Sequence, residues 1–98
     1  MDELEHPDLS SITLEQVLTA LGDPTRLEIF RKLLTEGCLP CGALVPGAAK
    51  STTTHHCKVL REAGLTRTKI CGTQRLLRVP ADEIETRFPG LLNLVRAS

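Results

Sequence analysis

The chain has 98 residues, which suits one small domain, and a domain of this size leaves about a third of its unfolded surface exposed, so dimerisation would stabilise it. No apolar stretch approaches the roughly 18 residues of a membrane helix, and the N-terminus is acidic, so we expect a cytoplasmic protein with no membrane partner and no signal peptide. The formal net charge is zero, but seven basic residues and one acidic residue lie between Lys50 and Arg78. This uneven charge favours nucleic acid as a partner.

Two helices are predicted in the first third of the chain, after a polar segment over residues 1–10 that we expect to be a flexible arm. Ser11 or Thr13 caps the first helix, and Asp23-Pro24 starts the second, because an aspartate N-cap and a proline at the first helical position both suit a helix start. Each helix ends at a glycine. Apolar residues recur at helical spacing in the first helix, at Leu14, Val17, Leu18 and Leu21. In the second helix they predict a buried stripe of Leu27, Phe30, Leu33 and Leu34.

A helix-turn-helix is predicted in the middle of the chain. The segment CLPCGALVPG is too short and too rich in proline and glycine for a long helix, so we predict a brief helix over residues 41–45 and a break at Pro46-Gly47. A longer amphipathic helix follows over residues 50–63. Its outer face carries short hydroxyl side chains, histidine and lysine, which suit a groove lined with base edges and phosphates. Short helix, break and polar-faced helix together indicate a helix-turn-helix.

The pattern changes to strands after this helix. Residues 65–70 and 74–79 are two short strand candidates with basic side chains, and Cys71-Gly72-Thr73 between them is a glycine-containing turn. This predicts a hairpin, and a basic hairpin behind a reading helix is a wing. A short helix ending at Arg87 and an apolar helix over residues 89–95 complete the chain. Together with the first helix, this last helix is predicted to form a dimer interface, with contacts from Leu14, Val17, Leu18, Leu91, Leu92, Leu94 and Val95.

Three motifs and a fourth short segment resemble the ArsR/SmtB family of bacterial winged-helix repressors. They are ALGDPTRLEIFRKLL at 20–34, STTTHHCKVLREAGL at 51–65, GTQRLLRV at 72–79 and RFPGLL at 87–92. The resemblance implies a mainly α fold with a small β-hairpin, a winged helix-turn-helix over residues 11–98, and a homodimer. It also implies a bacterial regulator, at the nucleoid when bound to DNA, that represses from an imperfect palindrome and leaves it when an inducer acts.

Two groups of residues are predicted to contact double-stranded DNA. The resemblance places one group on the groove side of the reading helix and matches His56 to a histidine of the family motif. The other group lies on the hairpin, where it can reach the minor groove or its phosphates. The predicted contacts are Lys50, Ser51, Thr52, Thr54, His55, His56, Lys58, Lys69, Thr73, Gln74 and Arg75.

The cysteines carry the most open prediction. Cys38 and Cys41 have the Cys-x2-Cys spacing that can bind one soft metal or metalloid ion, which would be the only cofactor, but no second pair completes a tetrahedral site. The pair is equally a candidate thiol switch, or has no sensing role. Cys57 lies on the inner face of the reading helix, where oxidation would disturb that helix. The last helix has no histidine, so the family's acidic and histidine metal site is absent from it.

Two other classes of function compete with DNA binding. A winged helix can serve as a protein-interaction module without touching DNA, since a fold alone does not fix a function. An enzyme is disfavoured, because the sequence has no phosphate-binding glycine loop and no set of residues typical of nucleophilic catalysis. We therefore predict a transcriptional regulator that is not an enzyme.

Overall fold

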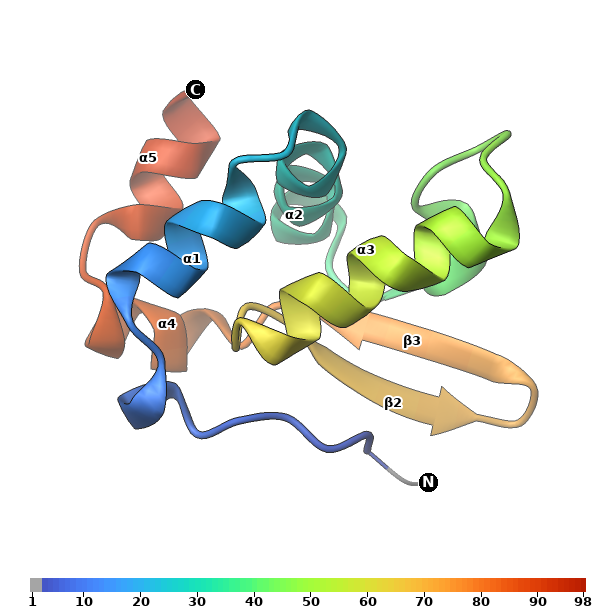
Figure 1. Cartoon of the computed structure of the whole chain (residues 1–98), viewed down its shortest axis with the longest axis horizontal. Coiled ribbons are helices and arrows are strands. Elements are labelled where there is room, and N and C mark those ends of the chain that lie inside the picture. Colours follow the sequence, from blue (N-terminus) through green and yellow to red (C-terminus); the bar gives the residue numbers. More distant parts are fainter. Residues whose placement is uncertain (1–2) are drawn as a thin grey trace.

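The computed structural model describes residues 3–98 as one packed unit in which helices surround the base of a small antiparallel sheet (Figure 1). The elements follow one another along the chain as η1 (Leu9–Ser11), α1 (Leu14–Leu21), α2 (Pro24–Glu36), β1 (Leu39–Pro40), η2 (Cys41–Ala43), α3 (Lys50–Glu62), β2 (Arg67–Cys71), β3 (Gln74–Arg78), α4 (Ala81–Arg87) and α5 (Leu91–Ala97). The predicted fold class, mainly α with a β-hairpin in a winged helix-turn-helix, is confirmed. Within the described residues, no helix is both long and apolar enough to cross a membrane.

The first two helices begin at the residues whose side chains cap them. The Thr13 hydroxyl accepts from the backbone N–H of Gln16, whose side chain accepts in turn from the backbone N–H of Thr13, a reciprocal capping box. The Asp23 carboxylate accepts from the backbone N–H of Arg26, directly before a proline at the first helical position. Of the two predicted caps for α1, Thr13 is the one used.

The helix-turn-helix is formed by η2, the following loop and α3. The predicted brief helix over 41–45 is a three-residue 3-10 helix, Cys41–Ala43, two residues shorter than expected. α3 begins at Lys50 as predicted and has no side-chain cap, since Ala49 occupies the cap position. Thr53, Cys57 and Leu60 form its buried face.

The sheet has three strands in the order β1, β3, β2, all antiparallel. β2 and β3 form the predicted hairpin, with Cys71 paired with Gln74 across a two-residue turn in which Gly72 adopts a φ of +63°. The strand β1, in which Leu39 pairs with Leu77, was not predicted. It ties the segment before η2 to the base of the wing, so the helix-turn-helix and the hairpin share one sheet.

The segment predicted as an arm runs along β2 (Figure 1). The backbone N–H of Leu4 donates to the Thr68 carbonyl over 2.8 Å, and Glu3 forms a bridge with Lys69. Leu9 is buried, and the Arg87 guanidinium donates to the carbonyls of Leu9 and Ile12. The arm is therefore in contact with the domain from residue 3 onward; residues 1 and 2 of the predicted arm lie outside the described residues, and its flexibility stays a prediction.

One hydrophobic core joins all the helices. Its fully buried members include Val17 of α1, Phe30 of α2, Leu60 of α3 and Ile84 of α4. α5 begins at Leu91 rather than at Pro89, because Gly90 adopts a left-handed φ of +89° that cannot start a right-handed helix. The helix packs on α2 and α4 and closes the core.

Candidate nucleic-acid interface

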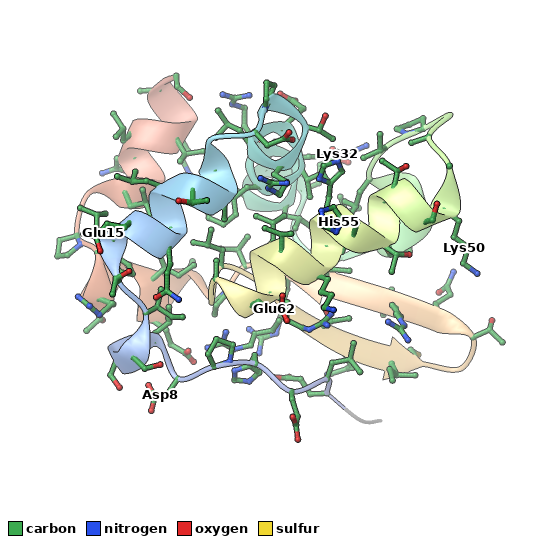
Figure 2. All side chains as sticks on the ribbon, viewed as in Figure 1. Asp8, Glu15, Lys32, Lys50, His55 and Glu62 are labelled. Atoms are coloured by element: carbon green, nitrogen blue, oxygen red, sulfur yellow. The ribbon has the colours of Figure 1, made fainter. Side chains whose placement is uncertain are left out.

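The outer face of α3 presents the side chains that the sequence singled out. Six side chains of this face are exposed: Lys50, Ser51, Thr52, Thr54, His55 and Lys58. In Figure 2 Lys50 lies at the start of this helix, His55 near its middle and Glu62 at its end. Hydroxyl and imidazole groups both donate and accept hydrogen bonds, and lysines attract phosphates. This face can therefore read base edges and hold a phosphate backbone at the same time.

Two features hold α3 in place against the domain. Its inner face contributes Cys57 and Leu60 to the core, and burial of a leucine side chain stabilises by about 1.5–3 kcal/mol. At its end the backbone N–H groups of Gly64 and Leu65 donate to the carbonyls of Arg61 and Leu60, the paired bonds of a Schellman motif. The chain then turns directly into the wing.

His56 differs from its neighbours because it faces α2. Its Nδ1 lies 3.3 Å from a guanidinium nitrogen of Arg26, whose Nε donates to the Ala20 carbonyl over 2.7 Å. A guanidinium can only donate, so Nδ1 of His56 accepts and the imidazole proton sits on Nε2. The contact gives His56 a packing role between α2 and α3. A phosphate contact from its other nitrogen stays a prediction.

Asp23 anchors the same junction from the start of α2. The backbone N–H of Arg26 donates to the Asp23 carboxylate over 3.0 Å and holds the pKa of Asp23 below its usual value, with smaller help from the positive charge of Arg26. The cap of α2, Arg26 and His56 thus form one chain of contacts that reaches α3. Sequence reasoning identified the cap but missed Arg26, because nothing in the sequence shows that its side chain crosses to a helix 30 positions later.

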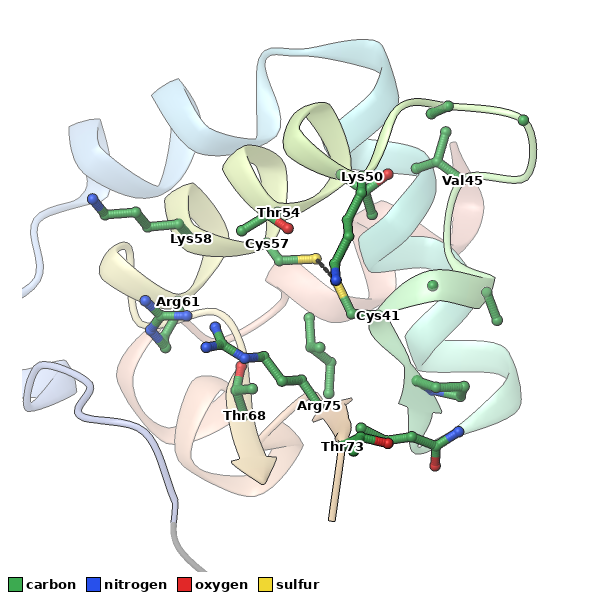
Figure 3. Close-up of a pocket in the computed structure, with 18 residues that line it drawn as sticks. Cys41, Val45, Lys50, Thr54, Cys57, Lys58, Arg61, Thr68, Thr73 and Arg75 are labelled. Carbon is green, nitrogen blue, oxygen red and sulfur yellow. Dashed lines mark hydrogen bonds between the residues drawn. The ribbon is translucent and has the colours of Figure 1, made fainter. Parts of the chain in front are cut away.

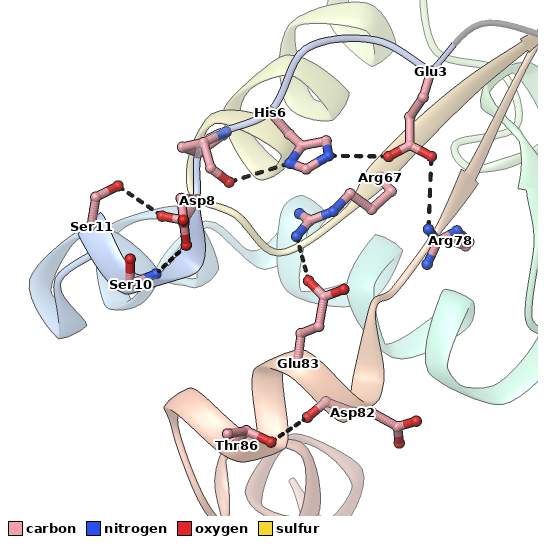
Figure 4. A network of polar contacts seen from close by, with 11 residues as sticks. Glu3, His6, Asp8, Ser10, Ser11, Arg67, Arg78, Asp82, Glu83 and Thr86 are labelled. Atoms are coloured by element: carbon pink, nitrogen blue, oxygen red, sulfur yellow. Dashed lines mark hydrogen bonds and ion pairs between the residues drawn. The ribbon is translucent and has the colours of Figure 1, made fainter.

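The wing presents a basic, polar tip beside α3. Lys69, Thr73, Gln74 and Arg75 are exposed, as a role in DNA contact requires. Two other basic residues of the same strands are neutralised within the protein (Figure 4). Arg67 is 4% exposed and pairs with Glu83 at 2.7 Å, and Arg78 lies 3.7 Å from Glu3. The charge count from the sequence therefore overstates the charge that this surface offers to DNA.

A pocket of about 1080 Å³ lies between α3, η2 and the wing (Figure 3). Lys50, Lys58, Arg61 and Arg75 contribute to its lining, and none of them pairs with an acidic side chain in the part of the chain that the structure describes. The pocket continues the basic surface of α3 onto the hairpin. Two of its lining residues are cysteines in contact with each other, Cys41 of η2 and Cys57 of α3.

The cysteines are arranged differently from the sequence prediction. The Sγ atom of Cys41 lies 3.2 Å from that of Cys57, whereas Cys38 is exposed and makes no sulfur contact within residues 3–98. In that range no three histidine, cysteine or acidic residues are grouped as a metal site would need. Binding of a metal or metalloid ion by Cys38 and Cys41 stays a prediction. The two thiols that lie in contact are those of Cys41 and Cys57, and their spacing in the sequence does not reveal this pairing.

The dimer surface stays a prediction, and the residues named for it differ in their exposure within one chain. Val17, Leu91, Leu92 and Val95 are buried within their own chain, so they cannot offer their side chains to a second copy. Leu14, Leu18 and Leu94 remain 49%, 53% and 67% exposed, and they are the large apolar side chains left exposed among the described residues. The candidate contact surface therefore consists of these three leucines from α1 and α5.

Comparison with known proteins agrees with this arrangement. Residues 21–69, from the end of α1 into β2, match the family model described as a helix-turn-helix domain. The chain is also 38% identical over 80 residues to the HTH-type transcriptional regulator YceK of Bacillus subtilis, an alignment that covers 79% of this chain and 80% of that protein.

Solved structures with the same fold are transcriptional regulators as well. The transcriptional repressor BigR from Xylella fastidiosa is 25% identical with a TM-score of 0.62, over 82% of this chain and 84% of that one. An ArsR-like transcriptional regulator from Rhodococcus sp. RHA1 has 24% identity and a TM-score of 0.65, over 83% of this chain and 77% of that one. At this level of identity the Rhodococcus likeness concerns the fold. The chain belongs to the family of helix-turn-helix DNA-binding transcriptional regulators, with the winged fold of its ArsR-type members.

Proposed function

We propose that this regulator binds a specific site in double-stranded DNA by inserting α3 into the major groove. The observation that carries the proposal is the outer face of α3, which presents polar and basic side chains on a helix whose inner face is fixed in the core. A major groove about 12 Å wide admits one α-helix. Thr52, Thr54 and His55 are assigned to base edges, because they are short or planar and can form hydrogen bonds in both directions.

Phosphate contacts are assigned to the basic residues on either side of that face. Lys50 and Lys58 lie on α3, Arg75 lies near the tip of the wing, and all three line the pocket between these elements. Each neutralised phosphate releases condensed counterions, so these residues supply affinity but little sequence preference. Lys69, Thr73 and Gln74 extend the wing contacts toward the minor groove.

The regulator is proposed to act as a homodimeric repressor on an imperfect palindrome. The three exposed leucines of α1 and α5 provide an apolar surface for a second copy. Two copies related by a two-fold axis place their reading helices about one turn of DNA apart, which matches a palindromic site. The likeness to BigR, a transcriptional repressor, supports repression, and the resemblance of the motifs supports release by an inducer.

The test compares specific and non-specific DNA. Fluorescence anisotropy is measured with a duplex from the region upstream of the chain's own gene and with a scrambled duplex, for the wild type, Thr52→Ala/His55→Ala and Thr19→Ala. Loss of two base hydrogen bonds should weaken binding to the upstream duplex about tenfold and leave the scrambled duplex unaffected. Thr19 is an exposed threonine of α1, so its variant should bind like the wild type. Equal affinity of the double variant and the wild type for the upstream duplex would contradict the assignment of α3.

Salt separates this function from a protein-interaction module. Binding through Lys50, Lys58 and Arg75 should weaken steeply with salt, and Arg75→Ala should lower the slope of log affinity against log salt by about one. Binding that does not depend on salt would instead favour the interaction module.

A further inference from the structure

Two thiols from different parts of the helix-turn-helix lie in contact. Cys41 opens η2, the first helix of the motif, and Cys57 lies in the middle of α3, the second helix. Their Sγ atoms are 3.2 Å apart (Figure 3). A disulfide has a sulfur to sulfur distance of about 2.05 Å, so the two atoms need to approach by only about 1 Å. Rotation of the two side chains and a small shift of a three-residue helix can supply this movement.

The two thiols differ in their access to small molecules. Cys41 and Cys57 both line the pocket between α3, η2 and the wing. Cys57 is only 5% exposed, whereas Cys41 is half-buried. Burial raises the pKa of the Cys57 thiol, and its contact with Cys41 adds to the shift. Cys57 thus stays protonated, and Cys41 is the thiol that a reagent in the pocket reaches first.

We propose that Cys41 and Cys57 form a reversible disulfide when the protein meets a hydroperoxide, and that this bond weakens DNA binding. The effect of the disulfide on DNA binding rests on the proposed function. The Cys41 sulfur attacks the peroxide, breaks its O–O bond and becomes a sulfenic acid, while the departing oxygen takes up the thiol proton as water or an alcohol. The Cys57 sulfur then attacks the Cys41 sulfur and expels its hydroxyl group, which leaves as water with the Cys57 proton. The two thiols lose two electrons and two protons, which the peroxide receives.

The bond would join the two helices of the DNA-reading motif directly. It closes a loop from residue 41 to residue 57, which contains the whole connection between η2 and α3 and about two turns of α3 itself. Two residues assigned to DNA contacts are close to Cys57 in the sequence: Thr54 is three positions before it and Lys58 is the next residue. Hydrogen bonds to base edges tolerate errors of only a few tenths of an ångström, so base contacts are lost when α3 takes up part of the approach of about 1 Å.

The other two cysteines provide matched controls. Cys38 is exposed and lies three positions before Cys41, and Cys71 is half-buried at the tip of the wing. Neither makes a sulfur contact in the described part of the chain. Removing either should leave the proposed bond intact.

The first experiment identifies the bond in the protein alone. The reduced chain is treated with hydrogen peroxide, its remaining thiols are alkylated, and it is digested with trypsin without reduction. Cleavage after Lys32, Lys50 and Lys58 puts Cys57 in the peptide 51–58 and both Cys38 and Cys41 in the peptide 33–50. We expect these two peptides to be linked in the wild type and in Cys38→Ser, and separate in Cys41→Ser. A bond inside the peptide 33–50, or a link that survives Cys41→Ser, would overturn the proposal.

The second experiment measures anisotropy on the upstream duplex before oxidation, after it, and after reduction with dithiothreitol. Oxidation should lower the affinity for the upstream duplex about tenfold, and reversibly, in the wild type, Cys38→Ser and Cys71→Ser. It should not change the affinity of Cys41→Ser or Cys57→Ala. Unchanged affinity of a fully cross-linked wild type would overturn the regulatory part of the proposal. A reduced protein that fails to bind would overturn that part together with the proposed function, whereas the peptide map decides the bond itself independently of DNA.

Discussion

Thr66 is one of the buried residues whose polar side chain lacks a hydrogen-bond partner among the described residues. Its side chain is fully buried at the entry to β2, and its hydroxyl has no hydrogen-bond partner among the described residues. A buried unpaired hydroxyl costs about 1–3 kcal/mol, and valine has nearly the same shape and suits extended backbone. Thr66→Val should therefore raise the free energy of unfolding by about 1 kcal/mol, measured by urea denaturation.

The control for this prediction is Thr73→Val, at the exposed tip of the same hairpin. Its hydroxyl is open to water, so the substitution should change the free energy of unfolding by less than about 0.5 kcal/mol. A destabilised Thr66→Val would mean that the buried hydroxyl does have a partner, such as an ordered water.

For single residues, the sequence predicted burial better than it predicted contacts. The inner position of Cys57 follows from helical spacing and is confirmed by its burial. Its contact with Cys41 did not follow, because it depends on how the loop between η2 and α3 folds back. Arg67 shows the reverse error: it counted as surface charge in the sequence, but the structure buries it against Glu83. Helical spacing shows which face of a helix is buried, but it does not show which residue on another element each buried side chain meets.

The end of α3 depends on the left-handed backbone of Gly64. Its φ is +76°, and a Cβ atom placed there would lie 2.8 Å from Cδ2 of Leu9 in the arm. Alanine in this conformation costs about 1–2 kcal/mol, and the contact with Leu9 adds to that cost. Gly64→Ala should therefore lower the free energy of unfolding by more than about 1 kcal/mol, with a matching fall in the thermal midpoint measured by circular dichroism.

Gly42 in η2 offers the matched glycine. Its φ is not positive, and nothing lies within 4 Å of a Cβ atom placed there. Gly42→Ala should leave stability unchanged or raise it by up to about 1 kcal/mol, because alanine restricts the unfolded chain. Equal losses in both variants would contradict the role given to the left-handed turn.

At the scale of elements, those with strong local signals were predicted well. The capping residues and glycines fix the ends of α1 and α2, and Lys50 is confirmed as the start of α3. β1 was missed because two residues carry no detectable alternation; the strand exists only because Leu39 pairs with Leu77 of β3. Elements defined by a distant partner are the ones that local sequence patterns cannot show.

At the scale of the whole molecule, the predicted homodimer depends on the three exposed leucines, Leu14, Leu18 and Leu94. Leu18→Glu/Leu94→Glu places two charges on the surface of α1 and α5 without touching the core, since both side chains are more than half exposed. Burying unpaired charges at an interface is strongly unfavourable, so the variant should sediment as a monomer at concentrations where the wild type is a dimer. Analytical ultracentrifugation measures this directly.

The control adds the same charge elsewhere. Ser10→Glu/Thr35→Glu changes two exposed polar residues of η1 and α2, elements that carry none of the three leucines. It should keep the oligomeric state of the wild type. A wild type that is monomeric throughout would remove the homodimer from the proposed function.

The dimer surface shows the limit of the sequence at this scale. Seven apolar residues of α1 and α5 were assigned to the interface, yet Val17 and Val95 among them belong to the core of a single chain. Hydrophobicity alone does not distinguish burial within one chain from burial between two. The exposed fraction of each side chain in the folded chain makes that distinction.

The path of the arm along β2 has a practical consequence for how this protein is handled in the laboratory. Leu4 and Glu3 pair with the strand that carries Lys69 of the wing, so a purification tag fused ahead of the chain would emerge beside the surface assigned to DNA. A tag after Ser98 would instead follow the end of α5. Binding measurements should therefore use protein from which the affinity tag has been removed by a protease.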